Sequence, residues 1–156
     1  MQESRKILPL MSDNQIFWDS VLQHPNSAQK PLVLIVEAHE PSRDLLQTIL
    51  TRKGCDVIEA DLENVMTIAE AVRPHLVMFD IGRPFTDGLE TLKQMQTCQS
   101  LNGVPIIITS GNGTTSFREQ VAATGYSELL VKPIDFDKLD WLLEQHLFTH
   151  LGRPSH

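Results

Sequence analysis

The sequence predicts an α/β fold in which five buried, parallel β-strands alternate with five α-helices. Short apolar runs and amphipathic stretches follow one another in strict order from residue 31 onward. The apolar runs are continuous rather than alternating with polar residues, which is typical of strands that helices cover on both faces. Glycine, proline or a capping residue stands at the junctions between the two kinds of segment. Together these observations indicate one doubly wound domain.

Each expected element corresponds to one stretch of this pattern. The expected strands are residues 32–36, 56–60, 76–80, 106–109 and 129–131. The expected helices are residues 41–53, residues 65–72, a stretch that carries Leu89, Leu92 and Met95 on one face, residues 115–123, and residues 135 to about 149. Right-handed crossovers leave few topologies for such a chain, and at this size the leading one is flavodoxin-like, with strand order 2-1-3-4-5.

Two of the helices have distinct ends and faces. Pro41 stands near the first position of helix 41–53, and Gly54 follows its last residue. Its expected apolar face consists of Leu45, Leu46, Ile49 and Leu50. Asp135 is the expected N-cap of the last helix. The inward face of that helix is expected to consist of Phe136, Leu139, Leu143 and Leu147, with Trp141 and Phe148 together on a different stripe.

Length and composition narrow the possible functions. The 156 residues fit one domain of ordinary size, and the net charge of -7 argues against electrostatic binding of nucleic acid. No apolar run is long enough to span a bilayer. Cys55 and Cys98 provide neither a disulfide framework nor a set of metal ligands, so a reducing, cytoplasmic location is expected.

The chain divides into three parts. Residues 1–30 read as an N-terminal extension and linker, with a short helix expected near residues 12–23. Residues 31–150 form the predicted domain, and residues 151–156 are a C-terminal tail. No room for a DNA-binding or enzymatic output domain is expected after residue 150.

Polar side chains stand where four of the expected strands end. They are Glu37, Asp80, Ser110 and Lys132. In the order 2-1-3-4-5 these strand ends meet at one edge of the sheet, which is where open α/β sheets bind ligands. Each residue alone could be a loop cap or a surface side chain. As a set, two acids, a hydroxyl and an ammonium suit transfer of a phosphoryl group to a carboxylate.

At these positions the sequence resembles the receiver domain of two-component response regulators. The resemblance covers about residues 31–149 and rests on the motifs VLIVEAHEPSRDLL, LVMFDIGRPFTDGLE, VPIIITSGNG and LLVKPID. It implies that Asp80 accepts a phosphoryl group from a histidine kinase, and that Ser110 and Lys132 contact this group. Ser110, rather than Thr109, matches the family's hydroxyl residue, five residues after Pro105. The family's Lys-Pro bond is often cis, which is cheap only before proline.

The resemblance also implies a Mg²⁺ site, and here the sequence departs from the family. Two adjacent acids normally follow the first strand, but this chain has Glu37 and Ala38. A methyl group cannot bind a metal, which leaves Asp80, the backbone carbonyl of Gly82 and Glu37 as ligands of a weakened site. His39 is either a solvated loop residue or a weak substitute ligand.

A second departure concerns the output face. Leu129 stands where the family usually has an aromatic switch residue, and leucine is readily explained as core. Trp141 either packs on a neighbouring element or belongs to an interface with a second copy, with a partner, or with the N-terminal Phe17 and Trp18.

Two functions remain open. The first is a single-domain response regulator that accepts a phosphoryl group on Asp80. It would have no enzymatic activity beyond its own phosphoryl transfer and autodephosphorylation. Its expected partners are a histidine kinase or phosphotransfer protein and a downstream protein target, with no direct binding to DNA or membrane. A homodimer is expected through the face of helix 115–123, strand 129–131 and the last helix. The alternative is a pseudo-receiver, an interaction module that works without phosphorylation.

Two further classes of protein fit the residues poorly. A phosphatase of the haloacid dehalogenase type would need a second aspartate two residues after Asp80, where Gly82 stands. A nucleotide-binding protein would need a glycine-rich phosphate loop after the first strand.

Overall fold

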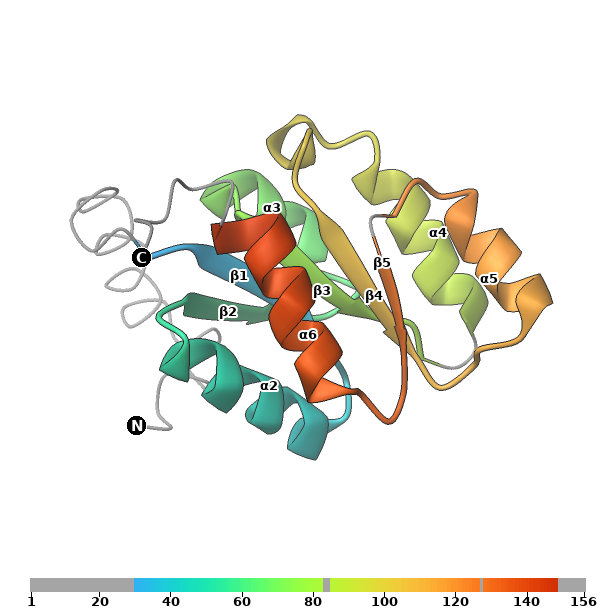
Figure 1. Ribbon diagram of the computed structural model, residues 1–156. Coiled ribbons are helices and arrows are strands. Elements are labelled where there is room, and N and C mark those ends of the chain that lie inside the picture. Colours follow the sequence, from blue (N-terminus) through green and yellow to red (C-terminus); the bar gives the residue numbers. More distant parts are fainter. Residues whose placement is uncertain (1–29, 83–84, 127, 149–156) are drawn as a thin grey trace. The chain divides into compact units, whose positions relative to one another are not determined.

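The computed structural model describes residues 30–82, 85–126 and 128–148. A parallel five-stranded sheet with strand order β2-β1-β3-β4-β5 forms its centre, as the sequence predicts (Figure 1). The strands are β1 (Leu32–Val36), β2 (Asp56–Ala60), β3 (Leu76–Asp80), β4 (Ile106–Ser110) and β5 (Glu128–Val131). Of the expected extension and tail, residues 1–29 and 151–156 lie outside the described residues, as do the predicted helix near 12–23, Phe17 and Trp18.

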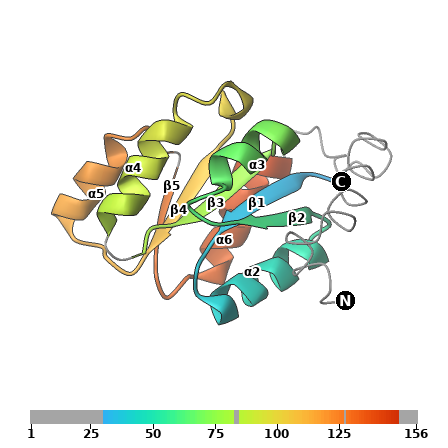
Figure 2. The same cartoon turned by 180° about the vertical axis from the view of Figure 1, so that it is seen from behind.

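Helices cover both faces of the sheet. They are α2 (Glu40–Arg52), α3 (Val65–Val72), α4 (Phe85–Met95), α5 (Thr115–Ala122) and α6 (Phe136–Leu143). Helices α2 and α6 lie on one face and α3, α4 and α5 on the other, as the two opposite views show (Figures 1 and 2). The sequence did not predict the short 3₁₀ helix at Gln99–Leu101.

The continuous apolar runs form strands because both of their faces are buried. All five residues of β1 and of β4 are buried. Alternate residues of a strand point to opposite faces, so each run supplies two layers of core. The core layer between the sheet and helices α2 and α6 is formed by residues of both, which are Val33, Ile35, Leu46, Leu50, Cys55, Leu76, Met78, Ile107, Leu130, Leu139, Leu142, Leu143 and Leu147.

Helix α2 begins and ends close to the expected residues. Pro41 lies in its first turn, and Gly54 follows the helix with a φ of 93°, a conformation that glycine adopts without a steric penalty. The apolar face predicted for this helix includes more residues than the fold buries. Leu46 and Leu50 are buried, but Leu45 is 48% exposed because it lies on the side of the helix away from the sheet.

Helix α6 begins where it was expected, but its buried face differs from the predicted one. The Asp135 side chain accepts the N–H groups of residues 137 and 138, which confirms the expected N-cap. Phe136, expected to face inward, is 42% exposed, and the fully buried Leu142 was missed.

Beyond Leu143 the helix widens into a π-helical turn, Glu144–Phe148. A wider turn rotates each residue less far around the axis. Phe148 therefore packs against the core while Trp141 stays 58% exposed, so the two do not share a stripe as expected.

His75 connects the first residues of β1 and β3. The Nδ1 atom of its side chain accepts the backbone N–H of Leu32 at 2.9 Å, and the backbone N–H of His75 donates to the Leu32 carbonyl at 2.8 Å. An imidazole accepts a hydrogen bond only in its neutral form. Partial burial of the His75 side chain lowers its pKa, which also favours this form.

We expect stability to fall in acid through His75. Its pKa is lower in the folded protein than in the unfolded chain, where it is about 6.5. The unfolded chain therefore binds more protons below pH 6.5, so this contribution is complete above that pH and declines below it. Urea unfolding at pH 7.5 and pH 5.5 measures it: the parent should lose more stability than His75→Ala. Equal losses would contradict this role.

Candidate functional site

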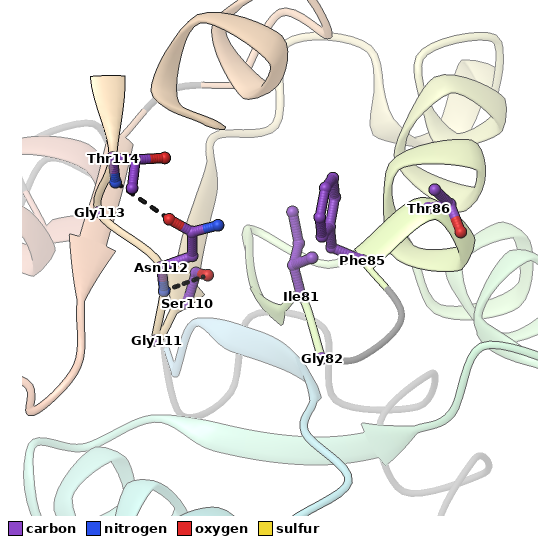
Figure 3. Close-up of a pocket in the computed structure, with 9 residues that line it drawn as sticks. All are labelled: Ile81, Gly82, Phe85, Thr86, Ser110, Gly111, Asn112, Gly113 and Thr114. Atoms are coloured by element: carbon purple, nitrogen blue, oxygen red, sulfur yellow. Dashed lines mark hydrogen bonds between the residues drawn. The ribbon is translucent and has the colours of Figure 1, made fainter. Parts of the chain in front are cut away.

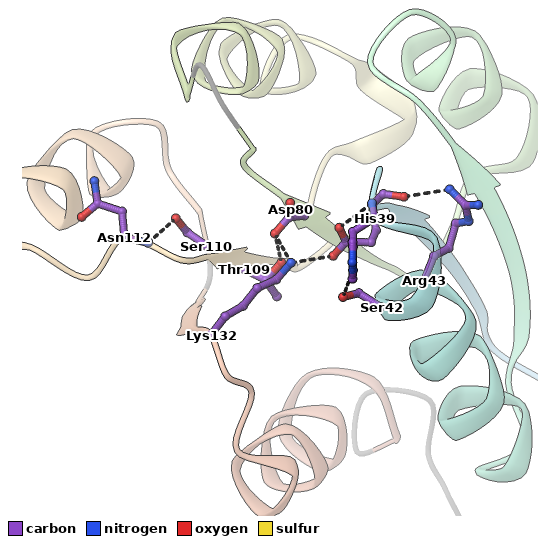
Figure 4. A network of polar contacts seen from close by, with 9 residues as sticks. His39, Ser42, Arg43, Asp80, Thr109, Ser110, Asn112 and Lys132 are labelled. Atoms are coloured by element: carbon purple, nitrogen blue, oxygen red, sulfur yellow. Dashed lines mark hydrogen bonds and ion pairs between the residues drawn. The ribbon is translucent and has the colours of Figure 1, made fainter.

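Four of the predicted side chains stand at the carboxyl edge of the sheet. Asp80 is the last residue of β3, Ser110 is the last of β4, and Glu37 and Lys132 directly follow β1 and β5. Strands β1 and β3 are neighbours, which places Glu37 beside Asp80. Lys132 reaches the same point from the edge strand β5 (Figure 4).

The ammonium group of Lys132 lies between the two acids. Its Nζ is 2.9 Å from Asp80 Oδ1 and 3.0 Å from Glu37 Oε1. Burial alone would lower the pKa of Lys132, but its hydrogen bonds to Asp80 and Glu37 and their negative charges outweigh this effect and raise it. The ammonium therefore keeps its proton at neutral pH, and this ion pair joins β1, β3 and β5 until the pH exceeds the raised pKa.

Glu37 is deeply buried, and both of its carboxylate oxygens have partners. The side chain is only 2% exposed. Oε1 binds Lys132, and Oε2 accepts the backbone N–H of His39 at 3.1 Å. The Arg43 guanidinium donates to the Glu37 carbonyl at 3.1 Å. Burial of this charge is tolerable because it is paired and hydrogen-bonded.

The two oxygens of Asp80 have different surroundings. Oδ1 accepts the hydroxyl of Thr109 at 2.9 Å in addition to Lys132. Oδ2 has no hydrogen-bond or ion-pair partner among the described residues. The Cβ atom that Gly82 lacks would lie 4.0 Å from it, and Asp80 lines a cleft of about 460 Å³. The sequence did not predict a role for Thr109. The register between β3 and β4 would have indicated it, because Thr109 is the direct partner of Asp80 across these strands.

Ser110 is bonded to this group through its backbone alone, because its carbonyl accepts the Lys132 N–H at 2.7 Å. Its hydroxyl accepts the Asn112 N–H at 3.0 Å and, in the part of the chain that the structure describes, forms no hydrogen bond with the side chains of Asp80 or Lys132. Ser110 instead lines a cleft of about 590 Å³ between the loops that follow β3 and β4 (Figure 3). Phe85 lines the same cleft and packs edge-to-face on Phe117 of α5, with the ring centroids 5.3 Å apart.

On the other side of Asp80 lies an acidic cleft of about 460 Å³. Its carboxylates belong to Glu37, Asp61, Glu63, Asp80 and Asp87. The lining also includes Ala38, Gly82 and Arg43. Such a surplus of negative charge repels a phosphoryl dianion unless cations compensate for it.

The described residues fit a Mg²⁺ ion poorly. Across residues 30–82, 85–126 and 128–148, no three His, Cys, Asp or Glu side chains are arranged to hold a metal. Ala38 offers no oxygen, and both oxygens of Glu37 already have partners. Oδ2 of Asp80 and the backbone carbonyl of Gly82 are the remaining members of the expected ligand set.

The remaining residues that the sequence predictions name have the following positions. His39 lies in the loop after β1, where its Nδ1 is 2.8 Å from the Ser42 hydroxyl. Leu129 is buried, as a core residue would be. The Lys132–Pro133 peptide bond is cis, as the resemblance implies. None of the described helices is long and apolar enough to cross a membrane.

The fold and the strand-end cluster define an α/β module of the receiver class, and comparison with known proteins agrees. The family model "Response regulator receiver domain" matches residues 33–144, more than half of the chain. The chain belongs to the response regulator receiver domain family.

Curated relatives support this assignment. A probable chemotaxis protein CheY of Rhizobium etli is 31% identical over 119 residues, covering 75% of this chain and 92% of that protein. The KDP operon transcriptional regulatory protein KdpE of Escherichia coli is 30% identical over 119 residues. That match covers 76% of this chain and 52% of KdpE, so the chain spans about half of that relative.

Solved structures share the fold. Chemotaxis protein CheY4 of Vibrio cholerae superposes with a TM-score of 0.69 at 23% identity, covering 76% of this chain and 99% of that one. The receiver domain of the sensor histidine kinase PA1611 of Pseudomonas aeruginosa gives 0.68 at 23% identity, covering 75% and 97%. That receiver domain was crystallised with a magnesium ion coordinated in its active-site cleft.

We expect Lys132→Met to destabilise the fold by about 1–3 kcal/mol. The substitution leaves the charge of Glu37 buried without its ammonium partner, a cost that the partial exposure of Lys132 moderates. Urea unfolding measures this free energy. Adding Glu37→Gln to Lys132→Met should recover part of the loss, because it removes the unpaired charge. An unchanged unfolding midpoint for Lys132→Met would show that the ion pair does not support the fold.

Proposed function

We propose that this chain is a single-domain response regulator that accepts a phosphoryl group on Asp80 and signals through protein contacts. The observation that carries the proposal is the arrangement of Asp80. One carboxylate oxygen has no partner among the described residues, while the other is held by an ammonium and a hydroxyl, and Asp80 lines a cleft. Family membership and the coverage of a CheY relative over 92% of its length support it.

The chemistry needs an exposed nucleophile and a cation beside it. Oδ2 of Asp80 would attack phosphorus in line with the leaving group, with its geometry fixed through Oδ1. Lys132 would approach the incoming oxygens and offset part of their negative charge. Ser110 would contribute by donating its O–H, because the hydroxyl oxygen only accepts the Asn112 N–H. The proposed phosphoryl donor is a histidine kinase or a phosphotransfer protein. The proposed location is the cytoplasm, because Cys55 and Cys98 are both free thiols.

Mg²⁺ binding is weakened in this proposal but not lost. Mg²⁺ commonly uses one or two carboxylates, water and phosphate oxygens, so Asp80 and the Gly82 carbonyl would form a minimal site. Each oxygen of Glu37 already has one partner, so Glu37 would contribute through a remaining lone pair, either directly or through water. Loss of a residue that only hydrogen-bonds to a metal ligand lowers metal affinity about 10- to 100-fold. The absence of a ligand oxygen at Ala38 should lower the affinity for Mg²⁺ at least as much.

The alternative is a pseudo-receiver that acts by contact alone. Ala38, the engaged Glu37 and the acidic cleft favour it, because all three oppose metal binding or the approach of a phosphoryl group. The buried Leu129 favours it as well, because a leucine does not provide the aromatic switch that the family resemblance implies.

Chemical labelling separates the two functions. We expect phosphoramidate or acetyl phosphate with millimolar Mg²⁺ to add one phosphoryl mass to the intact protein, measured by mass spectrometry. Asp80→Asn should remain unlabelled, because its amide oxygen is a poor nucleophile. If the parent protein gains no mass under these conditions, the receiver function fails and the pseudo-receiver alternative stands.

Ala38→Asp is the matched test of the metal site within the same assay. A carboxylate at this position should lower the Mg²⁺ concentration for half-maximal labelling at least tenfold, because it restores a direct oxygen ligand. Ala38→Asn is the control: it is of similar size, uncharged and a weaker ligand. Equal Mg²⁺ dependence for all three proteins would mean that residue 38 does not limit metal binding.

Protein contacts are proposed to use the face of α5, β5 and α6, including association with a second copy. Trp141 and Phe136 of α6 are 58% and 42% exposed, and large aromatic residues are enriched at interface hot spots.

Sedimentation velocity tests this interface. Trp141→Ala should weaken self-association by tenfold or more, whereas Leu45→Ala, which removes an exposed leucine on α2, should leave it unchanged. A monomeric parent, or equal association of all three proteins, would remove the homodimer from the proposal.

A further inference from the structure

Thr109 holds the Asp80 carboxylate from a position that the family motif does not use. It is 1% exposed, and its hydroxyl donates to Asp80 Oδ1 at 2.9 Å. The residue belongs to β4 and is the direct register partner of Asp80, so the backbone of both strands fixes this contact. Figure 4 shows Thr109 and Lys132 converging on the same oxygen of Asp80.

This contact makes the two Asp80 oxygens unequal. Oδ1 has two donors, the Thr109 hydroxyl and the Lys132 ammonium. Within the described residues, no hydrogen bond or ion pair involves Oδ2. Asp80 and Gly82 both line the acidic cleft, and the Cβ atom that Gly82 lacks would lie 4.0 Å from Oδ2. A carboxylate held at one oxygen by two fixed donors cannot rotate freely, so Oδ2 is the atom presented to an incoming phosphoryl group.

The same contact favours one state of Asp80 over the other. When Oδ2 forms its bond to phosphorus and the donor's bond to phosphorus breaks, Oδ1 changes from a charged carboxylate oxygen to a neutral carbonyl oxygen. A hydrogen bond to a charged acceptor is roughly twice as strong as one to a neutral acceptor. Thr109 therefore stabilises free Asp80 more than it stabilises the aspartyl phosphate.

Hydrolysis of the aspartyl phosphate reverses this change. Water attacks phosphorus, the bond between phosphorus and Oδ2 breaks, and its electron pair returns to the carboxylate while a water proton passes to solvent. Negative charge develops on Oδ1 as the bond breaks, directly opposite the Thr109 hydroxyl. A donor placed where charge develops lowers the barrier to that step.

On these grounds we propose that Thr109 is a positioning residue that selects Oδ2 as the acceptor atom and shortens the lifetime of the aspartyl phosphate. The inference rests on the proposed phosphorylation of Asp80 and goes beyond it. It assigns a role to a side chain one residue before the hydroxyl that matches the family motif.

The test compares the decay of the aspartyl phosphate in three variants with the parent. Protein labelled with phosphoramidate is freed of the donor, and the loss of the phosphoryl mass is followed over time. Thr109→Val keeps the volume but removes the donor, so decay should slow about fivefold. Thr109→Ser keeps a hydroxyl and should decay at nearly the parent rate. Thr124→Val removes another buried hydroxyl, one bound to the Val121 carbonyl, and should change nothing.

The outcomes are distinct. A labelled parent whose decay is unchanged or faster in Thr109→Val overturns the inference. Equal slowing in Thr124→Val overturns it as well, because a general effect of losing a buried hydroxyl would then be sufficient. An unlabelled parent counts against the proposed function instead.

A double-mutant cycle keeps the positioning role testable in that last case. The effect of Thr109→Val on the unfolding constant is measured by urea in the parent and in Asp80→Ala. The effect should be about fivefold smaller without the Asp80 carboxylate. Equal effects in both backgrounds would show that Thr109 does not hold Asp80.

Discussion

The ion pair of Lys132 with Glu37 and Asp80 is the interaction on which the rest of the site depends. It connects the ends of three strands and places one ammonium between two largely buried acids. Without it, two carboxylates would face each other at the edge of the sheet with no compensating charge. Its presence fixes Oδ1 of Asp80, occupies one oxygen of Glu37 and leaves Oδ2 as the open atom.

This arrangement bears on both proposed functions, the phosphorylated receiver and the pseudo-receiver. The Asp80 carboxylate and the Lys132 ammonium lie side by side, and the sheet topology holds them there. Ala38 has no oxygen to offer a metal, and the second oxygen of Glu37 accepts the His39 N–H. If Asp80 accepts a phosphoryl group as proposed, Lys132 would compensate part of the charge, and the acidic cleft would make transfer more dependent on the concentration of divalent cations.

The sequence was sufficient for most of the fold, for identifiable physical reasons. Continuous apolar runs predict strands buried on both faces, and glycine and proline at their boundaries locate the ends to within a residue or two. Helix α6 was less predictable, because tertiary packing rather than local preference decides its π-helical turn, Glu144–Phe148. Leu45 and Phe136 were misplaced because a stripe of apolar residues does not reveal how much of it the sheet covers.

The site residues were predictable only where they stand at strand ends. Glu37, Asp80, Ser110 and Lys132 follow from the rule that parallel strands carry ligand-binding groups at their carboxyl edge. Thr109 does not, because its contact depends on the register between two strands, which no linear motif contains. The contact between Glu37 and the His39 N–H was hidden for a similar reason, since it arises from the conformation of the loop after β1.

A crystal structure with beryllofluoride, a mimic of the phosphoryl group, and Mg²⁺ tests the central claim most directly. The claim is that Oδ2 of Asp80 is the acceptor atom, presented by contacts that hold Oδ1. The account predicts beryllium bonded to Oδ2, with the Thr109 hydroxyl still on Oδ1 and Lys132 beside the bound fluorides. Beryllium on Oδ1, or a ligand-free Asp80 at millimolar beryllofluoride, would contradict it.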